Sequence, residues 1–132
     1  MINGINSREM ILEILLEIEE GEHSHVAIRN ALSKYQFLPK QDRAFITRVC
    51  EGTLEYRIQI DYIINSFSKV TVDKMKPAIR EILRSAVYQL KYMDSVPDSA
   101  VCNEAVKLAQ RKGFYNLKPF VNGVLRTIAR EM

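Results

Sequence analysis

The chain has 132 residues, of which 47% are hydrophobic and 27% charged, a composition typical of one globular domain with a buried core. No apolar run approaches the ~18 residues of a membrane-spanning helix, and the first residues lack the basic and apolar segments of a secretory signal. We therefore expect a cytoplasmic protein that contacts no membrane and keeps its two cysteines as free thiols.

The charge is distributed unevenly along the chain. The net charge is +3, but residues 1–66 carry 7 basic against 10 acidic side chains, whereas residues 67–132 carry 12 against 6. A polyanion is therefore expected to find most of its attraction in the second half. Solvated cations on ordinary helix faces are the other interpretation, and composition alone favours it.

The first predicted helix begins after Asn6 and stops at Gly21. Asn6 and Glu9 match a capping pair, in which the amide oxygen accepts from an unpaired N–H of the first turn. Four apolar residues then recur at helical intervals on one face: Ile11, Ile14, Leu15 and Ile18. A second helix is predicted with Ser24 as its cap, and a third with Pro39 in its first turn.

Three further helices are predicted in the second half of the chain. Pro77 begins the first, Pro97 or Asp98 begins the second, and the third follows Asn116. Gly52 interrupts the long apolar pattern before them, and because glycine costs about 1 kcal/mol in a helix interior, we expect another helix to approach it closely. No segment alternates with the period of a strand, so the predicted fold is all-α, a compact bundle of six or seven helices.

The stretch VPDSAVCNEAVKLAQRKG places Cys102, Asn103 and Glu104 in succession on a predicted helix. A nucleophilic cysteine needs a lowered pKa and an accessible thiol, and no histidine lies near Cys102 in sequence. We therefore interpret Cys102 and Cys50 as structural and predict no catalytic residue. Glu104 is expected to be at least partly buried, accepting a hydrogen bond from an arginine or a backbone N–H.

Several polar residues of the late helices are predicted to hold the bundle together: Arg84, Asn103, Glu104, Asn122 and Arg126. Arg84 and Arg126 are the predicted partners of Glu104.

The glycines are isolated rather than clustered, so no nucleotide-binding loop is expected. His23 and His25 lack further ligands at suitable spacing, so no metal site is expected either.

Four segments together resemble the NusB family of RNA-binding helical domains. Two carry most of the resemblance: NEAVKLAQ (103–110), preceded by a valine-proline pair, and FVNGVLR (120–126). DRAFITRVCEGTLEYR (42–57) and ILRSAVYQLKYMDSVP (82–97) extend it over essentially the whole chain. The family fold is an all-helical bundle, which the periodicity predicts independently.

Within that family, the chain looks closer to the N-terminal domain of the RsmB (Sun, Fmu) type of rRNA cytosine-C5 methyltransferase. The stand-alone antitermination factor typically begins with an arginine-rich segment, whereas this chain offers only Arg8 before Arg29. The resemblance implies that residues 1–132 are a single RNA-binding domain, without the catalytic methyltransferase domain. That domain binds no cofactor itself, and S-adenosylmethionine is expected in the missing C-terminal domain.

The implied partners are RNA, in particular ribosomal RNA, and a covalently linked methyltransferase domain or a ribosomal protein. Two alternatives stay open: a stand-alone NusB-type transcription antitermination factor that binds RNA with a ribosomal protein, and a protein-interaction helical module. A large exposed apolar patch would favour the protein-interaction module, and a basic face would favour RNA.

The cations of the basic half are the candidate phosphate contacts, with polar and aromatic groups selecting unstacked bases. The candidate RNA-binding residues are Arg80, Lys91, Lys107, Arg111, Lys112, Lys118 and Arg130. Of these, Lys112, Lys118 and Arg130 are expected to be exposed phosphate contacts. Tyr88 and Tyr92 lie beside the basic stripe, but burial in the core is the more common role of such tyrosines.

Overall fold

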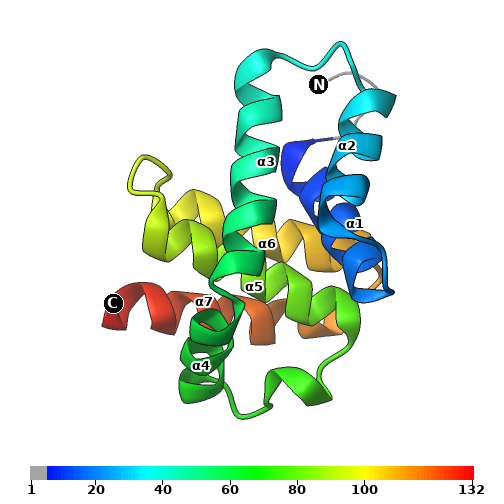
Figure 1. Ribbon diagram of the computed structural model, residues 1–132. Helices are drawn as coiled ribbons and strands as arrows, with labels where there is room; N and C mark the ends of the chain where they lie inside the picture. Colours follow the sequence, from blue (N-terminus) through cyan, green and yellow to red (C-terminus); the bar gives the residue numbers. More distant parts are fainter. Residues whose placement is uncertain (1–5) are drawn as a thin grey trace.

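The computed structural model describes residues 6–132, a bundle of α-helices joined by short connections (Figure 1). The helices are α1 (Ser7–Glu19), α2 (Ser24–Lys34), α3 (Lys40–Glu55), α4 (Arg57–Phe67), α5 (Pro77–Tyr92), α6 (Asp98–Arg111) and α7 (Lys118–Glu131). Two 3₁₀ turns, η2 (Val72–Lys74) and η3 (Tyr115–Leu117), precede α5 and α7. The all-α prediction is confirmed, and the described residues contain no β-strand.

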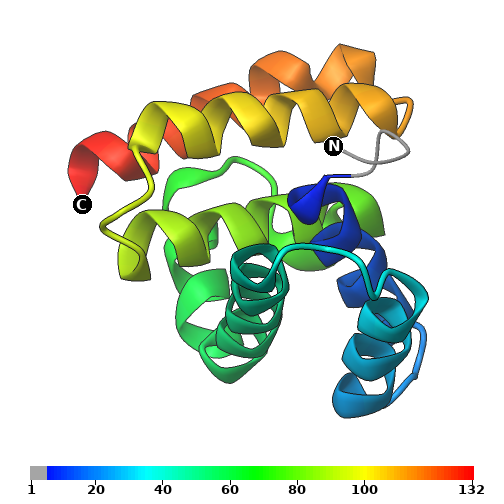
Figure 2. The same ribbon diagram turned by 90° about the horizontal axis from the view of Figure 1, so that it is seen from above.

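Helix α5 is the centre of the bundle. It contacts α1, α3, α4, α6 and α7. Helices α6 and α7 lie side by side and antiparallel along one side of α5, with α2, α3 and α4 on the opposite side (Figure 2). Helix α2 packs against α1 and α3 at the periphery. Burial of apolar side chains between these layers drives folding; fully buried ones include Leu12, Leu15, Ile46, Ile60, Leu83 and Leu125.

The ends of the first two helices follow from local chemistry. Asn6 Oδ1 accepts from the Glu9 N–H at 2.8 Å, which confirms the predicted cap. Gly21 has a φ of +117°, a left-handed conformation that glycine adopts readily and that ends α1 as predicted. The prediction that Ser24 caps α2 is wrong, because Ser24 is already the first helical residue. His23 occupies the N-cap position, and its side chain makes no capping hydrogen bond.

Proline marks the start of four helices, and Pro119 lies in the first turn of α7. Pro77 is the first residue of α5, as predicted. Pro97 directly precedes α6, in agreement with the predicted boundary. Pro39 precedes α3 rather than lying in its first turn. Its φ of −54° and ψ of 148° are those of an extended residue, a conformation that the pyrrolidine ring also permits.

Helices α3 and α5 approach closely at Gly52, as the sequence predicted. A Cβ atom added to Gly52 would lie 2.2 Å from two carbons of the Tyr88 ring. Tyr88 is 6% exposed and stacks on Tyr92 at 5.3 Å between centroids, and Tyr92 stacks on Tyr56 at 4.6 Å. The interpretation of Tyr88 as a core residue is confirmed, and the missing side chain of Gly52 makes room for it.

A partly buried charge network joins α1, α4 and α5. Arg84 donates to both carboxylate oxygens of Asp61 at 2.8 Å and to Glu81 Oε2 at 2.6 Å, while Arg80 pairs with Glu19. Burial of Glu81, together with the neighbouring Glu19 carboxylate, raises the pKa of the Glu81 carboxyl to about 8. A proton on Glu81 supplies a donor to the Glu19 carboxylate, whose Oε2 is buried without a partner among the described residues.

Replacement of Glu81 by glutamine should therefore change how stability depends on pH. The carboxyl group of Glu81 has a pKa of about 8 in the folded protein, whereas in the unfolded chain it loses its proton near pH 4.5. Raising the pH between these two values therefore favours the unfolded chain and destabilises the wild type. Relative to Glu81→Gln, the wild-type free energy of unfolding should fall between pH 5 and 8. The difference should exceed about 1 kcal/mol at pH 9. Urea unfolding of both proteins from pH 5 to 9 measures it, and a pH-independent difference would contradict the assignment.

Candidate nucleic-acid interface

A groove of about 430 Å³ lies between the last two helices. Its lining comes from α6 and α7 in equal parts: Asn103, Val106 and Lys107 on one side, Lys118, Pro119 and Asn122 on the other. The Lys107 side chain is 61% exposed. The groove therefore combines one cation from each helix with one amide from each helix.

Arg126 fixes the orientation of both amides. Its Nη2 donates to Asn103 Oδ1 at 2.9 Å, and its Nε donates to Asn122 Oδ1 at 3.1 Å. Because a guanidinium has donors only, the oxygen of each amide must face Arg126. The two NH₂ groups are then left to donate to other acceptors. Arg126 thus contacts both asparagines, and these are three of the five residues predicted to be structural.

Tyr115 adds an exposed aromatic ring beside Lys118, one of the residues that line the groove. Lys118 Nζ lies 4.5 Å from the centroid of this ring and donates to Gln110 Oε1 at 2.8 Å. Tyr115 is 64% exposed, so a face of the ring is open to an unstacked base. Sequence reasoning missed Tyr115 because it lies in the connection after α6, outside every periodic pattern. Its proximity to Lys118 is the one signal that could have identified it.

Three of the predicted RNA contacts pair with carboxylates of α1: Arg80 with Glu19, Arg111 with Glu9, and Lys112 with Glu13. The Arg111 pair is loose, with 3.8 Å between Nη1 and the carboxylate oxygen. Lys112 is less exposed than expected, at 29% of its side chain, because Glu13 holds it against α1. Arg80 also donates to the backbone oxygens of Val72 and Met75, so it is occupied within the fold.

The two other predicted cations lie outside the α6–α7 groove. Lys91 is near the end of α5, where its Nζ lies 5.7 Å from the centroid of the Tyr92 ring. Arg130 is 67% exposed near the end of α7, with Nε 3.5 Å from a carboxylate oxygen of Glu131. The structure thus brings only Lys107 and Lys118 together at the groove.

Glu104 is partly buried, with 29% of its side chain exposed, as predicted. The prediction of an arginine or backbone partner is wrong, because its carboxylate accepts from Lys107 Nζ at 3.4 Å. Lys107 lies one turn further along α6, whereas Arg84 and Arg126 are bound by other side chains. The Lys107 pair is exposed and contributes little to stability.

Both cysteines are buried, in agreement with a structural role. Burial raises the pKa of the Cys50 thiol and that of the Cys102 thiol, the opposite of what a nucleophile needs.

Within residues 6–132, no three metal-ligating side chains gather into a group. None of the described helices has the length and apolar character needed to cross a bilayer.

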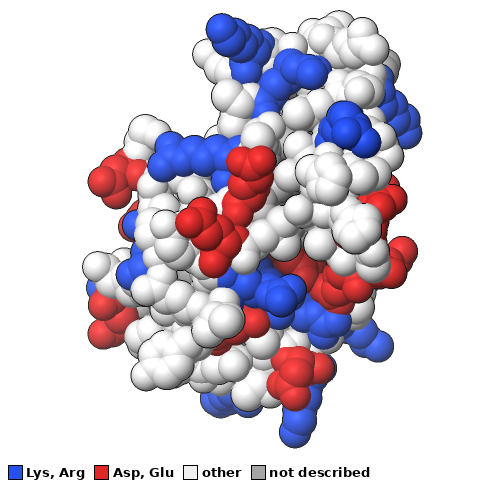
Figure 3. All heavy atoms as spheres, in the orientation of Figure 1, with Lys and Arg blue, Asp and Glu red and all other residues white. Residues whose placement is uncertain are grey.

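Basic side chains are not confined to the second half of the chain. On the face seen in Figure 3, lysines and arginines gather over the joined ends of α2 and α3. Lys34 and Lys40 flank this connection. Arg43 has a structural role there, because its Nη1 donates to the backbone oxygens of Leu32 and Tyr35 at 2.9 and 3.1 Å. A groove of about 820 Å³, lined among others by Lys40, Arg43 and Arg48, lies beside this surface. It lacks the pair of asparagines that Arg126 orients between α6 and α7.

The bundle and its groove define a class of protein: an all-helical domain with cations and oriented amides between its last two helices. The chain belongs to the NusB family, which it matches over residues 5–130. The resemblance seen in the sequence is therefore confirmed.

Two kinds of relative are similar to the chain. It is 35% identical over 124 residues to the "Probable ribosomal RNA small subunit methyltransferase B" of Bacillus subtilis, covering 94% of the chain but only 28% of that protein. It is 33% identical over 127 residues to the "Transcription antitermination protein NusB" of Bacillus velezensis, covering 96% of the chain and 95% of that protein. The chain thus spans less than a third of the methyltransferase relative and nearly all of the antitermination protein.

A solved structure described as "Antitermination Factors NusB and NusE in complex with dsRNA" has a similar fold. The TM-score is 0.86 at 20% sequence identity, and the match covers 96% of this chain and 95% of that one. At this identity the likeness establishes a shared fold alone.

Proposed function

We propose that this chain is an RNA-binding domain that holds single-stranded RNA in the α6–α7 groove. The observation that carries the proposal is the presence, around one groove, of two lysines, two oriented amide donors and an exposed tyrosine. Lys107 and Lys118 contact phosphates, the Asn103 and Asn122 NH₂ groups donate to base edges, and Tyr115 stacks on an unstacked base.

We infer further that this domain is the substrate-recognition part of a cytoplasmic small-subunit rRNA (cytosine-C5) methyltransferase. The likeness to the Bacillus subtilis protein supports this role. The domain described here contributes RNA binding. A covalently linked domain would bind S-adenosylmethionine and provide the catalytic groups. Residues 1–132 then act as one RNA-binding module without catalysis of their own.

A stand-alone antitermination factor that acts with a protein partner is the second candidate function. The outer face of α4 favours a protein contact, because Ile58 is 88% exposed and Tyr62, one turn later, is 75% exposed. Phe67, the last residue of α4, and Val70 after it are also exposed, at 38% and 39%. The gene sequence beyond codon 132 distinguishes the two functions: a cofactor-binding domain there supports the methyltransferase, and a stop codon supports the antitermination factor.

The double substitution Lys107→Gln/Lys118→Gln should weaken RNA binding about tenfold or more at physiological salt. It should also reduce the slope of log K against log salt by about 1.4, because each phosphate contact to a single strand contributes about 0.7. Fluorescence anisotropy with a 12-nucleotide single-stranded RNA, between 50 and 300 mM salt, measures both quantities.

The matched control is Lys40→Gln/Lys69→Gln, which removes the same charge from exposed positions away from the groove. This control should retain most of the affinity, and its salt slope should stay close to that of the wild type. If the control loses as much affinity as the groove variant, RNA binds by general charge or at the α2–α3 end, and the proposed interface is wrong.

A further inference from the structure

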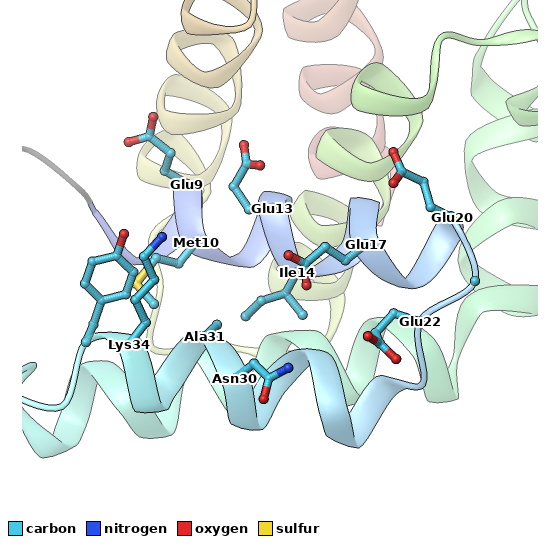
Figure 4. A pocket seen from close by; sticks show the side chains of 12 residues that line it. Glu9, Met10, Glu13, Ile14, Glu17, Glu20, Glu22, Asn30, Ala31 and Lys34 are labelled. Atoms are coloured by element: carbon cyan, nitrogen blue, oxygen red, sulfur yellow. The ribbon is translucent and has the colours of Figure 1, made fainter.

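A second groove, of about 780 Å³, lies between α1 and α2 (Figure 4). Its floor is apolar and is formed by Met10, Ile14, Ala31 and Tyr35. Five carboxylates and one cation surround the floor: Glu9, Glu13, Glu17, Glu20, Glu22 and Lys34. The groove is therefore apolar at its base and strongly acidic at its edges.

Ion pairs account for only two of the five carboxylates, although Glu22 Oε1 also accepts from the His23 N–H at 2.9 Å. Glu9 and Glu13 are directed away from α2 toward α6, where they pair with Arg111 and Lys112 (Figure 4). The other three lie toward the turn that joins α1 to α2, and within residues 6–132 they form no ion pair: Glu17, Glu20 and Glu22. These three carboxylates carry net charge that the fold leaves uncompensated.

Their positions are unfavourable for the free protein. Glu17 lies one turn from Glu13, and like charges at this spacing repel each other along a helix. Glu17 and Glu20 also lie at the C-terminal end of α1, where the helix dipole is negative and no basic residue occupies the last turn. A purely structural role does not explain carboxylates at positions where they lower stability, whereas a cationic ligand would compensate for them.

We propose that the α1–α2 groove binds a cationic amphipathic helix of a partner protein. Apolar side chains at i, i+3 or i+4, and i+7 would pack on the floor, as in other complexes where a helix occupies an apolar groove. Lysines or arginines beside them would face Glu17, Glu20 and Glu22. RNA is excluded from this surface because its phosphates would meet the same carboxylates. The proposal is independent of the proposed RNA function.

The probe is a synthetic 18-residue helical peptide with leucines along one face and lysines along the other. Fluorescence anisotropy at 0.15 M salt should show saturable binding to the wild type. Glu17→Gln/Glu20→Gln/Glu22→Gln should weaken this binding by about tenfold or more. The same variant should unfold at a temperature roughly 2–5 °C higher than the wild type, whereas a structural role for the three carboxylates predicts a lower one.

Two controls separate this site from general attraction between opposite charges. Glu51→Gln/Glu55→Gln/Asp94→Asn removes the same charge from exposed positions elsewhere and should bind the peptide within twofold of the wild type. A peptide with serine in place of leucine should bind at least about tenfold more weakly, because it cannot cover the apolar floor.

Four results would overturn the proposal. The first is that the wild type does not bind the peptide, and the second is that the two triple variants bind it with equal affinity. The third is that the serine peptide binds as tightly as the leucine peptide. The fourth is a wild-type dimer that is lost in the Glu17→Gln/Glu20→Gln/Glu22→Gln variant. The dimer would identify a second copy of the chain as the occupant. RNA affinity should be unchanged or higher in the groove variant, and Lys107→Gln/Lys118→Gln should bind the peptide normally. These two measurements show separately whether the proposal for the α1–α2 groove or the proposal for the α6–α7 groove is wrong.

Discussion

The substitution Gly52→Ala should lower the free energy of unfolding by about 1–2 kcal/mol. The new methyl group would lie 2.2 Å from carbons of the Tyr88 ring, and this ring is held between the core and Tyr92. Overpacking of this kind costs about 1–3 kcal/mol and exceeds the gain of about 1 kcal/mol that alanine offers in a helix. Urea unfolding followed by circular dichroism measures the change.

Gly123→Ala is the matched control for Gly52→Ala. Gly123 also lies inside a helix, but a Cβ atom added there would meet nothing within 4 Å. We therefore expect Gly123→Ala to stabilise the protein by about 0.5–1 kcal/mol. Replacing Tyr88 by leucine should relieve much of the Gly52→Ala defect. If Gly52→Ala is as stable as Gly123→Ala, α3 and α5 do not approach as described.

The substitution Arg84→Met should destabilise the protein by about 3 kcal/mol. Arg84 is 12% exposed and binds Asp61 and Glu81, so methionine would leave two carboxylates without their cation. The loss should be smaller at pH 5 than at pH 8, because protonation of Glu81 removes one of the two charges.

Arg130→Met provides the reference for loss of a cation without burial. Arg130 is 67% exposed, and its pair with Glu131 is worth less than about 0.5 kcal/mol. Thermal and urea unfolding of both variants at the two pH values test the difference. Equal stabilities of Arg84→Met and Arg130→Met would show that the network between α4 and α5 does not stabilise the bundle.

Helical periodicity was sufficient to predict the fold. Apolar residues at helical spacing define the buried side of α1, and the all-α bundle with its helix order follows from the same pattern along the chain. Gly52 was also predictable, because a glycine inside a helix needs a packing reason. Exact helix starts were less predictable: Ser24 and Pro39 are each displaced by one position, since several conformations at a helix start suit the same residue.

Side-chain partners could not be predicted from local spacing. Glu19 and Glu81 are 62 positions apart in the chain, and only the packing of α1 on α5 brings their carboxyl groups together. The same packing sets Glu13 beside Lys112, which reduces the exposure of a lysine expected to be free. Glu104 was expected to accept from an arginine or a backbone N–H, yet a lysine one turn away on α6 binds it.

The candidate interface was predictable in part. Lys107 and Lys118 were identified as cations of the basic half, but their position on two sides of one groove depends on how α6 packs against α7. The asparagines of the NEAVKLAQ and FVNGVLR segments were expected to be structural. Their contact with Arg126 also orients their NH₂ groups, which gives them a second role in the proposed RNA site.

The most direct test of the RNA interface is an NMR titration of the ¹⁵N-labelled chain with a 12-nucleotide single-stranded RNA. We predict the largest shifts in the side-chain NH₂ signals of Asn103 and Asn122 and in the backbone amides around Lys107, Tyr115 and Lys118. The signals of the α1–α2 groove should remain in place. Shifts confined to the joined ends of α2 and α3, or spread evenly over the exposed cations, would contradict the assignment of the α6–α7 groove as the RNA-binding surface.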